Sequence, residues 1–253
     1  MKDFLQNIEK NRNSSDQINF YEKLNEFIEE VDSSTINKMK AFPVYATRQI
    51  ITRFMDRYEV YKLSKNVPGS IIECGVGSGF GIMAFAHFAS IMEPYHYVKK
   101  IIGFDTFEGF PELSEKDKTS KANHMKKGGL DFGSFEELQK AIRLHDMNRP
   151  LGHIAKVELV KGDICKSLPT FLEKNPSLVV SLLYLDLDLY NATLETLKLL
   201  VDRIPKGGII AFDELNHADY PGETIAAMEA IGVGNLRLRR FDFSPMLAYA
   251  IKE

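Results

Sequence analysis

The feature that most constrains this fold is a series of short apolar segments that alternate with helix-forming stretches from residue 70 onward. These segments are apolar at nearly every position rather than at every second one. Strands with that pattern are covered on both faces, which is typical of parallel sheets between two layers of helices. The sequence therefore predicts a doubly wound α/β fold with parallel strands at Ser70–Val76, Ile101–Phe107, Val157–Val160, Val179–Leu189 and Gly208–Leu215.

The last twenty residues have a different pattern. Leu236–Phe243 and Met246–Ile251 both have strand character, and Ser244-Pro245 between them is typical of a tight turn. Two strands joined by so short a turn pair in antiparallel fashion. We therefore expect a terminal hairpin and at least one antiparallel strand at the edge of the sheet.

Residues 1–68 contain no good strand but two stretches in which apolar side chains recur every three or four residues, as on one face of a helix. The apolar stripes are Phe20, Leu24, Phe27, Ile28 and Val31 in the first stretch, and Ile50, Ile51, Phe54, Tyr58 and Tyr61 in the second, which runs from Thr47 to Lys65. Pro68-Gly69 ends this region. We predict a helical N-terminal extension, residues 1–68, before an α/β domain of residues 69–253.

Charge and composition argue against several classes of protein. The chain has 253 residues with 32 Lys+Arg against 35 Asp+Glu, so its net charge of −3 lacks the basic character of nucleic-acid binders. It contains no stretch of 18 uninterrupted apolar residues, so we expect no membrane span. The polar N-terminus lacks the apolar core of a secretory signal, which predicts a cytoplasmic protein. Cys74 and Cys165 lie too far apart to indicate a disulfide framework or a zinc site.

A glycine-rich turn follows the first predicted strand. Residues 73–79 are ECGVGSG, and a helix is expected directly after them. Glycines permit a tight turn and let a ligand approach the backbone, and a helix N-terminus offers unpaired N–H groups. The dinucleotide fingerprint G-x-G-x-x-G is absent because Phe80 and Ile82 stand where its last glycine would be, and no G-K-[ST] phosphate-binding motif occurs.

Acidic residues end the next two strands. Asp105 ends the second predicted strand and can accept hydrogen bonds from ribose hydroxyls, while Asp163 follows the third and can accept from an adenine amino group. For each of them a helix N-cap is the alternative. Three such features at three successive strand ends predict a bound nucleoside. The missing dinucleotide fingerprint favours S-adenosylmethionine over NAD.

The long segment 108–132 is rich in Lys, Gly, Ser and Asp and has no clear periodicity. Loops of this length in a compact domain are often lids or binding loops. This one follows the carboxyl end of a strand, where α/β sheets bind their ligands. We expect a lid, with a plain mobile insertion as the alternative.

The sharpest signal for chemistry is a group of acids at the ends of the fourth and fifth strands. Asp186 and Asp188 are two residues apart and would share one face of a strand, and Asp213-Glu214 ends the next strand. Neighbouring strands lie about 5 Å apart, so these carboxylates repel one another unless some take up protons or a cation neutralises them. Oxygen donors suit a hard divalent ion, Mg²⁺ first and Ca²⁺ or Mn²⁺ as alternatives. Water-facing helix N-caps are the other interpretation.

Five stretches of the sequence resemble the class I S-adenosylmethionine-dependent methyltransferases of the macrocin O-methyltransferase type. They are IIECGVGSGFG, IIGFDTFEGFPELSEKD, KVELVKGDI, LLYLDLDLYNATLETL and PKGGIIAFDELNHADYPGET, and the resemblance covers roughly residues 42–251 in matching order. It is closest to the branch that acts on 6-deoxyhexoses such as nucleotide-linked rhamnose. It implies a Rossmann-like, seven-stranded sheet with the last strand antiparallel, and a homo-oligomer.

The resemblance also implies roles for individual residues. Glu73, Gly75 and Gly77 would contact the methionine part of S-adenosylmethionine, Asp105 the ribose and Asp163 the adenine, and the predicted cofactor set is completed by Ser78, Ile164 and Asp186. Asp186, Asp213 and Glu214 would be metal ligands, although the family often has Asp-Asp where this chain has Asp213-Glu214. Asp188 would be the general base, with His217 as a rival because neutral imidazole accepts a proton near pH 7.

The leading hypothesis is therefore a metal-dependent O-methyltransferase that acts on a deoxysugar hydroxyl, in a nucleotide sugar or a glycoside. In this reaction a cation would hold adjacent hydroxyls while a carboxylate removes the proton. Methylation of a catechol-like hydroxyl is an alternative, because vicinal oxygens also chelate Mg²⁺. A non-catalytic nucleoside-binding module on the same fold is another, since a fold does not establish a function. An NAD oxidoreductase is a distant further alternative.

Overall fold

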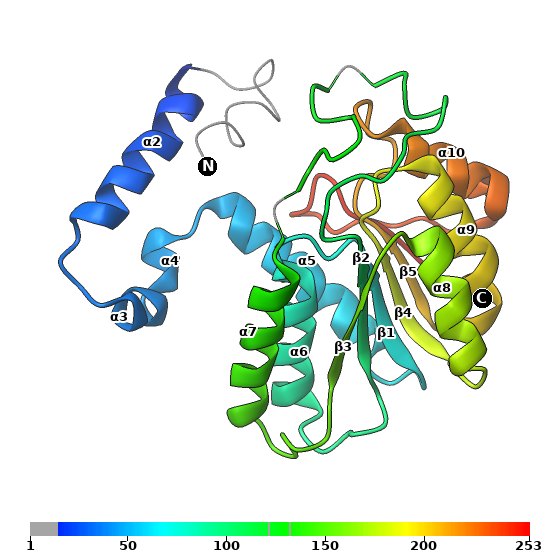
Figure 1. Ribbon diagram of the computed structural model, residues 1–253, viewed down its shortest axis with the longest axis horizontal. Helices are drawn as coiled ribbons and strands as arrows, with labels where there is room; N and C mark the ends of the chain where they lie inside the picture. Colours follow the sequence, from blue (N-terminus) through cyan, green and yellow to red (C-terminus); the bar gives the residue numbers. More distant parts are fainter. Residues whose placement is uncertain (1–14, 121, 132) are drawn as a thin grey trace.

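One mixed sheet lies between two layers of helices in the computed structural model, which describes residues 15–120, 122–131 and 133–253 (Figure 1). Its strands are β1 (Ser70–Cys74), β2 (Ile101–Asp105), β3 (Val157–Lys161), β4 (Val180–Leu185), β5 (Ile209–Phe212) and β6 (Ala248–Ile251). The strand order is β3-β2-β1-β4-β5-β6, and all pairs are parallel except β5 with β6. The predicted doubly wound α/β fold and its antiparallel edge strand are confirmed.

The direction in which strands are added reverses between β1 and β4. Strands β2 and β3 are added on one side of β1, and β4, β5 and β6 are added on the other. Open α/β sheets bind their ligands at such a switch point, beyond the carboxyl ends of the strands. The predicted cofactor turn and the predicted acidic cluster follow β1, β4 and β5, so the topology brings them together at this point.

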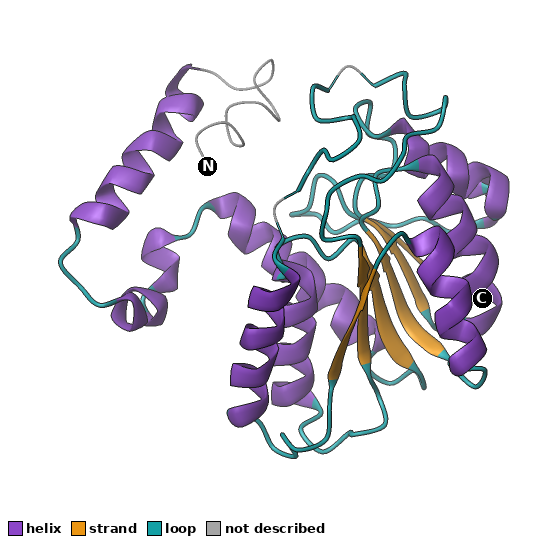
Figure 2. Ribbon diagram, viewed as in Figure 1, coloured by secondary structure: helices purple, strands orange, loops and turns teal. Residues whose placement is uncertain are grey.

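The helices cover both faces of the sheet (Figure 2). Side chains alternate along each strand, so Ile71 and Leu182 pack under one layer while Ile72 and Leu183 pack under the other. The first layer consists of α5 (Arg48–Ser64), α6 (Phe80–Met92) and α7 (Phe135–Met147), and the second of α8 (Ile164–Lys174), α9 (Tyr190–Leu200) and α10 (Pro221–Ala230). Short 3₁₀ turns occupy Val201–Arg203 and Val233–Asn235.

The predicted N-terminal extension divides into two parts. Helix α5 packs against α6, β4 and β5, so it belongs to the first helical layer although it precedes residue 69. Helices α2 (Ser15–Glu30), α3 (Thr35–Lys40) and α4 (Phe42–Tyr45) lie to one side of the sheet (Figure 1). They carry exposed apolar side chains, Phe20, Phe27, Ile36, Met39, Phe42 and Val44. Exposed apolar side chains that cluster in this way are typical of surfaces that contact another protein. The homo-oligomer remains a prediction.

The predicted seventh strand is the main correction to the fold. Within Leu236–Phe243 only Arg239 pairs with a strand, through an antiparallel bridge to Tyr249, so the sheet of the described residues has six strands instead of seven. The chain turns before a ladder can form, because Ser244 N–H donates to Phe241 O and Ser244 Oγ donates to Asp56 Oδ2 at 3.0 Å. That contact ties the segment to α5. No helix among the described residues is long and apolar enough to cross a membrane.

Candidate active site

A cavity of about 760 Å³ opens beyond the carboxyl ends of the parallel strands. It is bounded by the turns after β1, β2, β3, β4 and β5, by α5 and by the loop before β6. All but one of the predicted site residues line it: Glu73, Gly75, Gly77, Ser78, Asp105, Asp163, Ile164, Asp186, Asp188, Asp213 and Glu214. The exception is His217, which is not among the lining residues.

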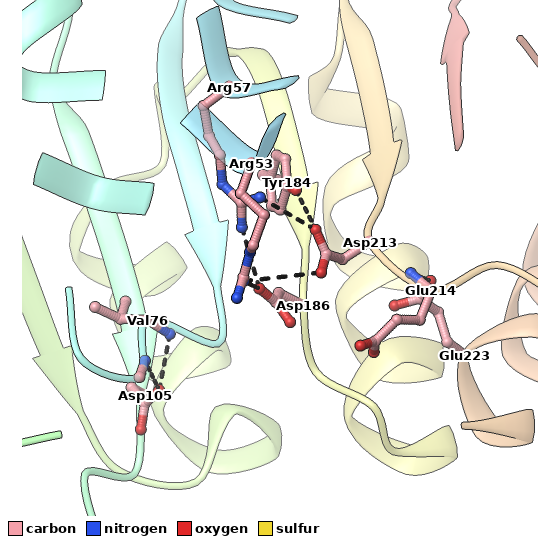
Figure 3. A network of polar contacts seen from close by, with 10 residues as sticks. Arg53, Arg57, Val76, Asp105, Tyr184, Asp186, Asp213, Glu214 and Glu223 are labelled. Atoms are coloured by element: carbon pink, nitrogen blue, oxygen red, sulfur yellow. Dashed lines mark hydrogen bonds and ion pairs between the residues drawn. The ribbon is translucent and has the colours of Figure 1, made fainter. Parts of the chain in front are cut away.

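The glycine-rich turn is held in place by Asp105. The backbone N–H groups of Val76 and Gly77 both donate to Asp105 Oδ2 at 2.8 Å (Figure 3). Phe107 N–H donates to Asp105 Oδ1 at 2.6 Å. Gly75 has a φ of +89°, and a Cβ there would lie 1.7 Å from the backbone oxygen of Asp186. Glycine is therefore required where the turns after β1 and β4 approach each other.

Glu73 lies buried at the base of this turn. Its Oε2 has no hydrogen-bond partner, and burial raises the pKa of its carboxyl to about 8 despite the opposing charge of Arg57. A Cβ on Gly81 would lie 1.8 Å from Glu73 Oε1, so the glycine at 81 makes room for this carboxyl group. A buried, unpartnered acid on a cavity wall is suited to a cationic ligand group.

Asp163 and Ile164 lie where the chain enters α8. Asp163 is the N-cap of this helix, because its Oδ1 accepts from Cys165 N–H at 3.0 Å. The helix N-cap that was the alternative role for Asp163 is therefore present, and Asp163 also lines the cavity. One carboxylate oxygen is used by the cap, and Asp163 Oδ2 is 3.7 Å from Lys166 Nζ.

Three carboxylates converge on the far side of the cavity. Oxygens of Asp186, Asp188 and Glu214 lie within 4.8 Å of one another, close enough to share a cation. Burial raises the pKa of all three, and the charges of neighbouring acids add to the shift for Asp186 and Glu214. Asp188 Oδ1 and Glu214 Oε2 are buried without a hydrogen-bond partner. Buried oxygens of this kind fit a hard divalent cation.

Asp213, predicted with this group, is engaged elsewhere. Its Oδ1 lies 3.3 Å from Arg57 Nη1 and accepts a hydrogen bond from the Tyr184 hydroxyl, and its Oδ2 lies 4.0 Å from Arg53 Nη2 (Figure 3). Burial alone would raise the pKa of Asp213, but Arg57 and Arg53 outweigh it and hold the pKa below its ordinary value. Asp213 is therefore the acid of this site that is most firmly ionised.

Sequence reasoning missed the two arginines. Arg57 is fully buried, lies 3.3 Å from Asp186 Oδ2 through Nη2, and stacks 4.4 Å from the centre of the Tyr184 ring. The predicted stripe of α5 is wrong in part, because Ile50, Phe54 and Tyr58 are exposed. The buried face is instead Asp56, Arg57, Val60, Tyr61 and Ser64. The sequence did contain a signal for this face, because the charged residues at 53, 56 and 57 lie on the same side of the helix as Tyr61.

His217 and Tyr220 lie just beyond the acids. The ring of His217 is 5.2 Å from that of Tyr220, and His217 Nδ1 accepts from Asp219 N–H at 3.3 Å. Tyr220 lines the cavity, and its hydroxyl lies 2.8 Å from His124 Nε2 in the long segment after β2. Asp188 is thus the candidate base that reaches the cavity directly.

The long segment forms a wall of the cavity through Gly109, Phe110, Pro111 and Leu130. It is tied back to the second helical layer, because buried Asp117 accepts from the N–H of Tyr190, the first residue of α9, at 2.8 Å. Lys121 and Phe132, within the predicted lid, lie outside the described residues. The lid role remains a prediction.

Comparisons with known proteins agree on one family. The sequence model of the macrocin O-methyltransferase (TylF) family matches residues 18–229. The crystal structure of CalS11, calicheamicin methyltransferase, is 30% identical, with a TM-score of 0.90 over 95% of this chain and 94% of that one. The apo structure of CalS11, described as TDP-rhamnose 3'-O-methyltransferase, is 29% identical, with a TM-score of 0.81 over 95% of this chain and 96% of that one.

A third structure shows the same fold at greater distance. The O-methyltransferase NovP is 22% identical, with a TM-score of 0.64 over 80% of each chain. A search of curated protein sequences found no match.

Proposed function

Because the chain belongs to the macrocin O-methyltransferase family, we propose that it transfers a methyl group from S-adenosylmethionine to a hydroxyl of a 6-deoxyhexose, with a divalent cation bound at the acidic cluster. The chain is an S-adenosylmethionine-dependent O-methyltransferase. The sugar substrate is supported by CalS11, which matches over nearly the whole chain and is described as acting on TDP-rhamnose.

The cofactor assignment follows the strand ends. We assign the methionine part to Glu73, Gly75, Gly77 and Ser78, supported by the positive-φ turn and by the buried, unpartnered carboxyl of Glu73. Asp105 would receive the ribose, and Asp163 with Ile164 would bound the adenine, because they follow the two strands beyond β1 on the same side of the sheet.

The observation that carries the metal proposal is the pair of orphaned buried oxygens, Asp188 Oδ1 and Glu214 Oε2, beside Asp186. Leaving such atoms without a partner is costly. A hard cation would be the partner of Glu214 Oε2, and the acceptor hydroxyl beside that cation would be the partner of Asp188 Oδ1. We assign Asp186 and Glu214 as ligands, with Asp213 able to add Oδ2, the oxygen not used by Arg57 and Tyr184. Mg²⁺ is the first choice.

Asp188 is the proposed general base. Burial raises the pKa of its carboxyl, which makes the carboxylate a stronger proton acceptor than an ordinary aspartate. When bound, the cation would stabilise the developing alkoxide of the sugar. The protein's part is to hold the acceptor hydroxyl beside Asp188 and in line with the sulfonium methyl, since positioning supplies much of the acceleration.

The test is S-adenosylhomocysteine release with dTDP-rhamnose as acceptor, first with Mg²⁺ and then with excess EDTA. Turnover that requires the metal would support the reaction, the substrate class and the cation together. Equal turnover in EDTA would overturn the metal proposal alone. No turnover with the nucleotide sugar, but turnover with a rhamnoside or a catechol, would replace the acceptor while leaving the reaction class in place. S-adenosylmethionine binding with no turnover on any acceptor would favour the binding-module alternative.

A further inference from the structure

The ion pair between Arg53 and Asp186 has no role in the chemistry described so far. Arg53 Nη2 lies 3.5 Å from Asp186 Oδ2 and 4.0 Å from Asp213 Oδ2. Both carboxylates also contact Arg57 at 3.3 Å, so each keeps a cationic partner if Arg53 moves. The side chain of Arg53 is 52% exposed against 1% for Arg57. Arg57 is thus a fixed structural cation, whereas Arg53 can exchange its partners at low cost.

Arg53 also stands at the end of the cavity where the methionine part is expected. It lines the cavity together with Glu73 and Gly75, and its guanidinium carbon lies 5.8 Å from the ring centre of Phe80, the first residue of α6. In the view of Figure 3 its side chain extends beside Asp186, on the side of the turn that carries Val76. A cation and an acid therefore face the same space next to the glycine-rich turn.

We propose that the Arg53–Asp186 pair is the receptor for the zwitterionic amino-acid end of S-adenosylmethionine. The α-carboxylate of the cofactor pairs with Arg53 and the α-ammonium with Asp186 Oδ2, the oxygen that contacts the arginines in the free protein, which leaves Asp186 Oδ1 for the proposed cation. Glu73 is a second acid on the ammonium side. This inference rests on the proposed function, and it assigns a cofactor contact to α5, outside the strand-end turns from which the cofactor site was predicted.

Charge balance favours this exchange. The ion pair between Arg53 and Asp186 is replaced by two ion pairs with the cofactor, and the zwitterionic end of the cofactor adds no net charge to a site that already contains two arginines and several acids. A ligand with only the ammonium would leave Arg53 without its new partner and would add a positive charge beside two arginines. The pair should therefore select for a cofactor that carries the carboxylate.

The experiment compares S-adenosylmethionine with its decarboxylated analogue by isothermal titration calorimetry. We expect wild-type protein to bind S-adenosylmethionine about ten-fold more tightly than the analogue, the value of one charge-assisted contact at a half-exposed site. In Arg53→Gln this ratio should fall to near one, and in Arg53→Lys part of it should remain. Each ratio compares two ligands on the same protein, so a general loss of folded material cannot produce the change.

Lys62→Gln is the matched control. Lys62 lies on the same helix, is exposed and pairs with Glu59, so the variant removes one positive charge at the surface, away from the cavity lining. It should keep the wild-type ratio. A ratio that persists in Arg53→Gln, or falls equally in Lys62→Gln, would overturn this inference while leaving the proposed function intact. Wild-type protein that binds no S-adenosylmethionine would overturn both.

Discussion

Replacing Arg57 by methionine should destabilise the protein by about 3–5 kcal/mol at pH 7, because it leaves two carboxylates in the site without their buried partner. Arg57 is 1% exposed and lies 3.3 Å from both Asp186 and Asp213. Methionine retains much of the volume beside the Tyr184 ring, so the loss is mainly electrostatic. For a chain of this size that free energy corresponds to a fall in Tm of roughly 6 to 20 °C.

The destabilisation should depend on pH in a defined direction. The pKa of Asp213 in the folded protein lies below its ordinary value, so this group stabilises the fold above its unfolded pKa of about 4, and that contribution is lost as the pH falls through the folded pKa. Without Arg57, burial would raise the pKa of Asp213 instead. The difference between wild type and variant should therefore be largest near neutral pH, begin to shrink as the pH falls through the raised pKa of Asp213 in the variant, and stop shrinking once the pH is below the lowered pKa of Asp213 in the wild type.

The assay is urea unfolding at several pH values, with Arg53→Met as the control. Arg53 contacts the same two acids but is half-exposed, so its loss should cost about 1 kcal/mol or less. Adding Asp213→Asn to Arg57→Met should restore part of the stability, because it removes the unpaired charge. Equal costs for the two arginine variants, or a cost for Arg57→Met that does not change with pH, would refute the reasoning.

The remaining predictions concern the site. Asp188→Asn should lower turnover by about 10²–10⁴-fold while leaving S-adenosylmethionine affinity unchanged; near-normal turnover in that variant would transfer the base role to His217. Gly81→Ala should weaken cofactor binding on the order of ten-fold, because the new Cβ forces the Glu73 carboxyl to move, and an unchanged calorimetric Kd would contradict this. Cofactor affinity should rise from pH 6 to pH 7.5, because Glu73, with a pKa of about 8 in the free protein, must lose its proton to accept an ammonium group; the slope should disappear in Glu73→Gln.

The strands of this fold could be predicted because their signal is local. Each of the five parallel strands lies within a predicted apolar segment or extends one residue beyond it. Helix α5 begins and ends within one residue of the predicted stretch Thr47–Lys65, and α6 begins directly after the glycine-rich turn, as expected. The terminal hairpin depended on a contact distant in sequence. Ser244 bonds Asp56, 188 residues away, and no pattern within Leu236–Phe243 contains that information.

The buried face of α5 could not be chosen from hydrophobicity alone. Two faces of the helix carry large side chains, and the one with Phe54 and Tyr58 is the more apolar in sequence. Arg57 lies inside because Asp186 and Asp213, from two different strand ends, are there to neutralise it. A buried arginine is tolerable only with such partners, and those partners are brought to α5 by the tertiary fold.

The two aspartates after β4 illustrate the same limit more sharply. Side-chain alternation placed Asp186 and Asp188 on one face, but β4 ends at Leu185 and Asp188 has a φ of +61°, in the left-handed region. As a result Asp186 turns its Oδ2 toward the arginines, whereas Asp188 lies against Glu214 with one oxygen unpartnered. A strained backbone at a non-glycine residue persists only where surrounding contacts impose it. Here Asp117 holds the N–H of Tyr190, two residues beyond the strained position. The separation of the acid that pairs with the arginines from the proposed general base therefore depends on the turn, and strand periodicity carries no information about it.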